Sequence, residues 1–149
     1  MPFRYIYPGG CHCHNVAIRL HSDKTPSELP LRSDSCSFCN KHRAVYTSDP
    51  RGEVFVEIGD ANLLTRYRFG TRTADFLICK ACGVFVAAYM PEPSLAVVNA
   101  NVLDARTDFL ANDLGVVDLD GESLDARLAR RRARWTPVGL LVGAAAPLP

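Results

Sequence analysis

Six cysteines in three closely spaced pairs constrain this chain more than any other feature of its sequence. Residues 1–10 contain no apolar stretch of the kind that a secretory signal peptide needs, so we expect a cytoplasmic protein with reduced thiols. Because two cysteines on one short turn can bind the same metal ion, the spacing favours metal sites over disulfides. The pairs are Cys11-x-Cys13, Cys36-x2-Cys39 and Cys79-x2-Cys82.

The first and third pairs together supply the four thiolates of a closed structural zinc site. A glycine adjoins each pair, Gly10 before the first and Gly83 after the last, where it lets the chain bend tightly. Such a site would join two distant parts of the chain. The alternatives are a disulfide or a group of buried free thiols. The predicted ligands are Cys11, Cys13, Cys79 and Cys82.

The central pair has different neighbours. Asp34 precedes Cys36 by two residues, where extended backbone returns a side chain to the same face, and His42 follows Cys39 by three residues. Two thiolates with a carboxylate or an imidazole are typical of a catalytic zinc site that keeps an open position. The residues therefore predict a second, open zinc site at Cys36 and Cys39 with Asp34 or His42. The alternatives are a weak or empty site and a metal-free, redox-active pair of thiols.

Composition indicates one globular domain and excludes several classes of partner. The 149 residues are 48% hydrophobic and 22% charged, with a formal net charge of +1. This charge gives no field that would select nucleic acid or an acidic membrane, so we expect neither as a partner. The longest apolar run, residues 138–146, is too short to span a bilayer. The arginines of residues 130–134 are interpreted as the solvated end of a helix rather than a nucleic-acid contact.

Hydrophobic patterning predicts a mainly β fold with one clear helix. The helix spans residues 121–135, with Asp118 or Asp120 as its N-cap, and a shorter one lies around residues 107–114. We expect a single domain over residues 1–137, arranged as a compact sheet or open barrel, and an Ala-, Gly- and Pro-rich tail over residues 138–149 that is partly docked or frayed. The predicted strands are residues 15–20, 44–47, 54–58, 64–69, 75–78, 84–90 and 95–99.

Five segments within residues 5–105 form an ordered set of motifs. They are GGCHC at 9–13, CSFC at 36–39, YRFGT at 67–71, CKACGV at 79–84 and VNANVLD at 98–104. In this order they resemble the glutathione-dependent formaldehyde-activating enzyme family, which also includes the centromere protein V group. The resemblance implies a mainly β zinc fold of coiled sheets. It also implies a structural zinc on the first and last pairs and a second, labile zinc at a catalytic site in the central motif.

The activity that the resemblance implies is the addition of glutathione to formaldehyde, which gives S-hydroxymethylglutathione. The reverse reaction cleaves a carbon–sulfur bond, so the expected class is a carbon–sulfur lyase with small thiol and aldehyde substrates. Arg66, Arg68 and Arg72 are candidates to bind the carboxylates of glutathione, or else they form an exposed strand face. The alternative function is a non-catalytic, zinc-stabilised binding or scaffold module of the centromere protein V type.

The chain departs from the family at one position. The family's central motif begins with a cysteine, and here that residue is Asp34. Two thiolates and one carboxylate carry the same charge as three thiolates, so the substitution conserves the charge of the ligand set. We therefore expect Asp34, Cys36 and Cys39 to be both the catalytic residues and the ligands of the second zinc. His12 and His14 flank Cys13 but are expected to point away from the metal.

Overall fold

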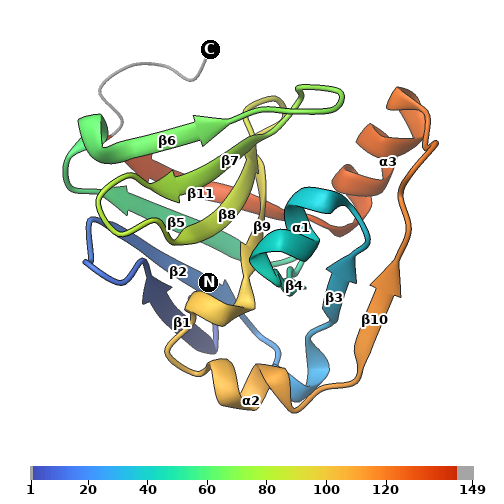
Figure 1. Cartoon of the computed structure of the whole chain (residues 1–149). Coiled ribbons are helices and arrows are strands. Elements are labelled where there is room, and N and C mark those ends of the chain that lie inside the picture. The colour runs from blue at the N-terminus through green and yellow to red at the C-terminus, as the bar shows by residue number, and fades with distance from the viewer. Residues whose placement is uncertain (1, 144–149) are drawn as a thin grey trace.

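The computed structural model describes residues 2–143, and these form an open mixed sheet that folds over into two facing layers (Figure 1). In one layer, β1 (Tyr5–Gly10), β2 (Val16–Ser22) and β5 (Glu53–Ile58) run antiparallel, with Val16 opposite Ile58. The other layer has the order β6–β7–β8–β9–β4–β3–β10. Its strands are Leu64–Tyr67, Asp75–Cys79, Phe85–Met90, Leu95–Asn99, Tyr46–Thr47, Leu31–Asp34 and Leu114–Val117, in that order.

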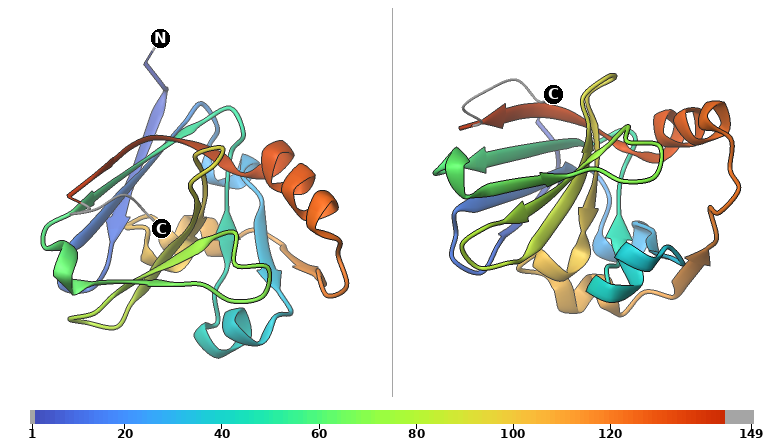
Figure 2. Two further views of the ribbon diagram at one scale, coloured as in Figure 1. Left: turned by 90° about the horizontal axis from the view of Figure 1, so that it is seen from above. Right: turned by 45° about the horizontal axis from the view of Figure 1, so that its top comes forward.

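Strand β11 (Thr136–Val142) joins the two layers. Its first residues, Thr136 and Pro137, pair with β9, and from Val138 onward it pairs in parallel with β5. The views in Figure 2 show β11 crossing from one layer to the other beside α3 (Leu124–Arg134). The remaining helices are α1 (Ser37–His42), α2 (Arg106–Leu110) and the 3-10 turns η1 (Pro26–Glu28), η2 (Ala61–Leu63) and η3 (Ala100–Val102).

The core divides into two clusters. The larger fills the space between the layers, where alternate residues of β2 and β5 meet the fully buried strands β8 and β9. The smaller cluster surrounds Trp135 and Met90 and includes Cys39 and Tyr46. Among residues 2–143, no helix is long and apolar enough to cross a membrane.

The mainly β character expected from the sequence is confirmed, but several element boundaries are wrong. The long helix begins at Leu124, and Ser123 caps it by accepting a hydrogen bond from the Ala126 backbone, so neither Asp118 nor Asp120 is the N-cap. The shorter helix ends at Leu110, and the residues expected to finish it lead into β10. Strands β1, β3, β10 and β11 and helix α1 were not expected.

The tail expected over residues 138–149 begins inside a strand. Residues 138–142 belong to β11, because their backbone completes the ladder along the free edge of β5. Gly139 lies close to β5, because a Cβ on Gly139 would lie 2.7 Å from a carboxylate oxygen of Glu53. Residues 144–149, the rest of the expected tail, lie outside the described part of the chain.

Strand β1 approaches η3 so closely that only glycine fits at residue 9. Gly9 forms an isolated bridge with Leu103, and a Cβ on Gly9 would lie 2.2 Å from the Val102 carbonyl oxygen. We predict that Gly9→Ala lowers the free energy of unfolding by about 1–3 kcal/mol, the usual effect of overpacking, in urea denaturation. Gly115→Ala is the matched control, since its Cβ would meet only Leu31 O at 3.6 Å. Equal stability of the two variants would contradict this account of Gly9.

Candidate metal centres and the adjoining pocket

The first and third cysteine pairs meet in space. Cys11 and Cys13 lie in the turn after β1, while Cys79 ends β7 and Cys82 lies in the turn before β8. The four sulfurs lie within 4.8 Å of one another, with Sγ–Sγ distances of 3.8 Å from Cys11 to Cys13 and 3.5 Å from Cys13 to Cys79. Sulfurs at about 2.3 Å from a tetrahedral ion lie roughly 3.7 Å apart. This cluster therefore fits one metal ion enclosed by four thiolates.

The turns around this cluster direct backbone N–H groups at sulfur. Val16 N donates to Cys11 Sγ at 3.2 Å, and Gly83, with φ of +78°, closes its turn by donating to Cys79 O at 2.8 Å. Burial would raise the pKa of Cys82, but the backbone N–H groups of Cys13 and Val84 and the neighbouring thiols lower it to about 6. These donors favour the thiolate of Cys82, which is the form that binds metal.

We predict that Cys79→Ser removes one metal equivalent and destabilises the fold by several kcal/mol, on the order expected when metal binding is coupled to folding. The reason is that Cys13 and Cys79 are 66 positions apart and belong to different layers. Metal analysis and thermal unfolding give the two readouts. Cys36→Ser is the control for stability, because Cys36 lies outside this cluster and its replacement should cost only the metal equivalent of the second cluster. A Cys79→Ser variant as stable as the control would contradict the prediction.

The second cluster brings together Asp34, Cys36 and Cys39. Asp34 ends β3, Cys36 caps α1, and Cys39 is buried within that helix. The ligand atoms of all three lie within 4.8 Å of one another, and the Cys36 backbone N–H donates to Asp34 Oδ1 at 2.9 Å. The two sulfurs are 2.9 Å apart, so they must separate to bind one tetrahedral ion. Two thiols and a carboxylate are nevertheless a donor set that suits zinc.

The structure excludes the candidate histidines from both clusters. His42 is exposed and packs on Phe38, with ring centroids 4.4 Å apart. His12 and His14 are exposed on the turn after β1, also outside the four-sulfur cluster, as expected. Asp34 is therefore the third ligand group that the described residues offer at the second cluster.

Tyr46 is a partner of the second cluster that the sequence did not indicate. Its hydroxyl lies 3.0 Å from Cys39 Sγ, within hydrogen-bonding distance. Burial, followed by the charge and the hydrogen bond of Cys39, raises the pKa of Tyr46, so the phenol stays protonated and can donate to sulfur. Burial also raises the pKa of Cys39, with Cys36 and Asp34 acting in the same direction. A cation at this cluster would offset that effect and favour the thiolate.

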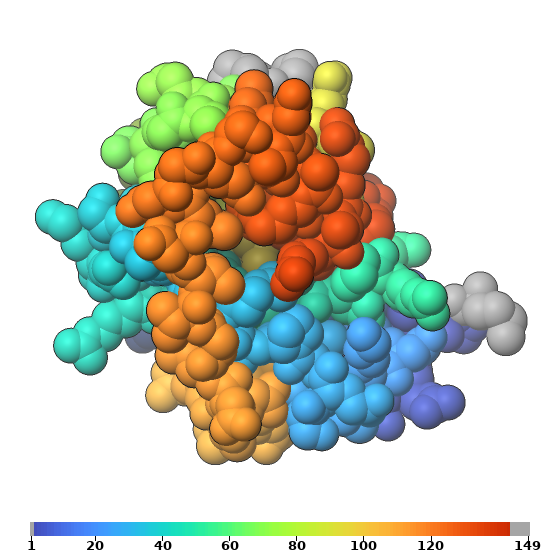
Figure 3. All heavy atoms as spheres, turned by 90° about the vertical axis from the view of Figure 1, so that its right-hand side faces the viewer, coloured from blue at the N-terminus to red at the C-terminus, as the bar shows by residue number. Residues whose placement is uncertain are grey.

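The second cluster lies on the wall of a cavity of about 590 Å³. Apolar side chains such as Phe76, Val97 and Trp135 line its interior. Figure 3 shows the molecular face on which it opens, hollowed between α3, β3 and the segment that follows β10. The cavity is large enough for a small-molecule ligand. Its charged lining residues are Arg32, Asp34, Asp120, Arg127, Arg130 and Arg131.

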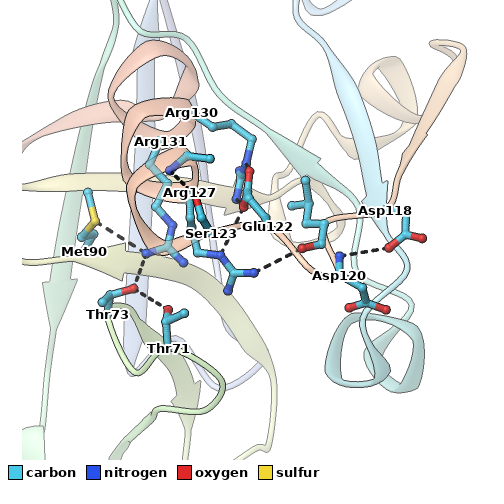
Figure 4. A network of polar contacts seen from close by, with 12 residues as sticks. Thr71, Thr73, Met90, Asp118, Asp120, Glu122, Ser123, Arg127, Arg130 and Arg131 are labelled. Carbon is cyan, nitrogen blue, oxygen red and sulfur yellow. Dashed lines mark hydrogen bonds and ion pairs between the residues drawn. The ribbon is translucent and has the colours of Figure 1, made fainter.

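Three arginines of α3 line this cavity, namely Arg127, Arg130 and Arg131. The interpretation of residues 130–134 as a solvated helix end is therefore wrong for Arg130 and Arg131 and holds for Arg132 and Arg134, which are exposed. Glu122 accepts two hydrogen bonds from Arg130, at 2.9 and 3.1 Å, and one from Arg127 at 3.2 Å (Figure 4). Arg131 is only 6% exposed. A sequence signal for this burial exists: Leu128, Arg131 and Trp135 share one helix face, so Arg131 occupies a position that faces the core.

The three arginines that were candidates to bind glutathione, or else to form an exposed strand face, lie outside this cavity. Arg68 donates to the buried carboxylate of Asp75 at 2.6 Å and to Arg72 O at 3.2 Å. Neither these two nor Arg66 lines the cavity beside the second cluster. The cavity arginine that comes from β3, Arg32, was missed because β3 itself was not expected. Burial lowers the pKa of Arg32, and the charges of Arg134 and Arg130 lower it further.

Comparison with known proteins bears mainly on the fold. No protein-family model matches the chain. A crystal structure of a Rhodobacter sphaeroides protein, a structural genomics target, is similar to it, with 28% sequence identity and a TM-score of 0.60. The match covers 74% of this chain and 99% of that one. The chemistry of this chain must therefore be argued from its two clusters and the cavity.

Proposed function

We propose that the protein is a zinc-dependent carbon–sulfur lyase that forms or cleaves glutathione–aldehyde adducts of the S-hydroxymethylglutathione kind. One observation carries the proposal: the second ligand cluster has three groups and lies on the wall of a cavity, whereas the first has four. A structural zinc site is closed by four protein ligands, while a catalytic one keeps a position for substrate. The motifs that resemble the formaldehyde-activating family support the same function.

The residues of the second cluster have distinct roles in this proposal. Asp34, Cys36 and Cys39 hold the ion, which when bound supplies a Lewis acid that lowers the pKa of a thiol. The hydroxyl of Tyr46 lies 3.0 Å from Cys39 Sγ, where it can donate to a thiolate and hold that sulfur in place. Phe76 and Val97 give the cavity apolar walls beside these groups. No further protein nucleophile is needed, because the thiol of the substrate attacks the aldehyde carbon and its proton passes to the aldehyde oxygen.

We also propose a reducing compartment such as the cytoplasm, because both ligand clusters need their cysteines as free thiols. The rival function is a zinc-stabilised binding or scaffold module of the centromere protein V type. It requires only the four-sulfur cluster, so the two functions differ in how many metal ions the chain holds. The cavity beside Asp34, Cys36 and Cys39 favours the enzyme.

The deciding experiment measures zinc content and lyase activity for variants of Asp34. We predict that Asp34→Ala loses the second zinc equivalent and the activity with glutathione and formaldehyde, and keeps the first equivalent. Asp34→Cys should keep both equivalents, because it restores a third thiolate. Asp120→Ala is the matched control, since Asp120 lines the same cavity outside the ligand cluster and should keep both zinc ions.

Two results would contradict the proposal. If Asp34→Ala keeps both zinc equivalents, Asp34 is not a ligand. If the wild type holds only one equivalent under zinc-replete conditions and forms no adduct, the protein is better described as a binding module.

A further inference from the structure

Two arginines of the cavity have no carboxylate partner among the described residues. Arg131 projects from α3 and Arg32 from β3, and both line the cavity beside the second cluster. The ion pairs of residues 2–143 include neither of them. Burying a guanidinium group without a counter-ion costs free energy, so proteins seldom keep such a group unless it has a function.

Several contacts position the guanidinium of Arg131, but they leave some of its N–H groups without an acceptor. Nη1 donates to Thr73 Oγ1 at 2.7 Å and to Met90 Sδ at 3.6 Å (Figure 4). The guanidinium also lies 4.8 Å from the ring centroid of Trp135. Nε is buried without an acceptor, and no described residue accepts a hydrogen bond from Nη2. Burial lowers the pKa of Arg131 to about 10, with Arg130 and Arg127 acting in the same direction, so the group remains a cation that an anion would stabilise.

Arg32 is similarly positioned by neutral groups. Its Nη2 donates to Ser48 Oγ at 2.7 Å, and Ser48 Oγ in turn donates to Arg134 O at 2.7 Å, at the end of α3. These contacts fix the guanidinium of Arg32 against α3 without neutralising its charge.

The other charges of the cavity do not remove the excess of positive charge. Arg127 and Arg130 share the single carboxylate of Glu122. Asp120 is exposed, and a zinc ion held by two thiolates and Asp34 would leave the second cluster with one negative charge against the four arginines of the cavity. The two guanidinium groups without ion pairs thus match one or two monoanionic groups of a ligand.

We propose that Arg131 and Arg32 form a carboxylate-binding subsite, which holds the substrate by its carboxylate while its sulfur lies at the second cluster. The inference rests on the proposed function in taking an anionic thiol as the substrate. A carboxylate presents two oxygens in one plane and so suits the N–H groups of a guanidinium, and it supplies the acceptor that Arg131 lacks. The neutral thiol 2-mercaptoethanol would lack this anchor, so the subsite also selects among thiols.

The test measures ligand binding through the fluorescence of Trp135, which is the single tryptophan of the chain and adjoins Arg131. The zinc-loaded protein is titrated with S-methylglutathione, which has no free thiol, with its dimethyl ester, with succinate and with inorganic phosphate. We expect both carboxylate probes to bind and the ester to bind at least roughly tenfold more weakly than its acid. Arg131→Met and Arg32→Gln should each weaken the binding of S-methylglutathione by roughly tenfold or more and leave the binding of the ester unchanged.

Arg132→Met is the matched control, because Arg132 lies next to Arg131 on α3 but is exposed and does not line the cavity. Thermal unfolding of each variant establishes that it is folded, and Arg32→Gln tests the subsite even if Arg131→Met unfolds. Ester binding equal to acid binding, or unchanged binding in folded Arg131 and Arg32 variants, would overturn the subsite. If phosphate binds and neither carboxylate probe does, the subsite does not bind carboxylates and the proposal is overturned.

The same titration separates failure of the subsite from failure of the proposed function. If succinate binds in an Arg131-dependent way but S-methylglutathione does not, the carboxylate subsite stands and glutathione is not the substrate. If adduct formation is measured but neither carboxylate probe depends on Arg131 or Arg32, the lyase function stands and the subsite is wrong.

Discussion

The contact between the sulfurs of Cys13 and Cys79 is the constraint on which the rest of the structure depends. Cys13 follows the edge strand β1 of one layer, and Cys79 ends β7 of the other, so their common cluster ties the two layers together at one end. Cys11 and Cys79 are also buried members of the core between the layers. A metal ion held there would link folding of the core to formation of the site.

The second cluster differs from the first in what surrounds it. The four-sulfur cluster is saturated with protein ligands, and its surroundings offer backbone donors to sulfur. Asp34, Cys36 and Cys39 instead border a cavity, and the guanidinium groups of Arg131 and Arg32 face the same cavity with no carboxylate partner within residues 2–143. One fold therefore contains one centre suited to stability and one suited to a ligand that carries negative charge.

Spacing alone predicted which cysteines meet, because short-spaced pairs leave few ways to assemble four ligands. It also placed Asp34 beside Cys36 and Cys39. The arginines of the cavity could not be found in this way, since their positions depend on how α3 and β3 lie on either side of the cavity. Strand β3 is short and partly polar, and β10 is short and mostly exposed, so their existence depends on pairing with distant partners rather than on local pattern. Arg131 was missed because a run of arginines suggests solvent, although its place on the helix face of Trp135 indicated burial.

X-ray absorption at the zinc edge of the zinc-replete wild-type protein tests the central claim most directly, because it counts sulfur and oxygen ligands without relying on activity. With a four-sulfur centre and a centre of two sulfurs and a carboxylate, the account predicts about three sulfur ligands per zinc at about 2.3 Å, with lighter ligands at about 2.0–2.2 Å. In Asp34→Ala the average should rise to about four sulfurs per zinc, as the second ion is lost. An all-sulfur environment in the wild type, with one zinc per chain, would contradict the account.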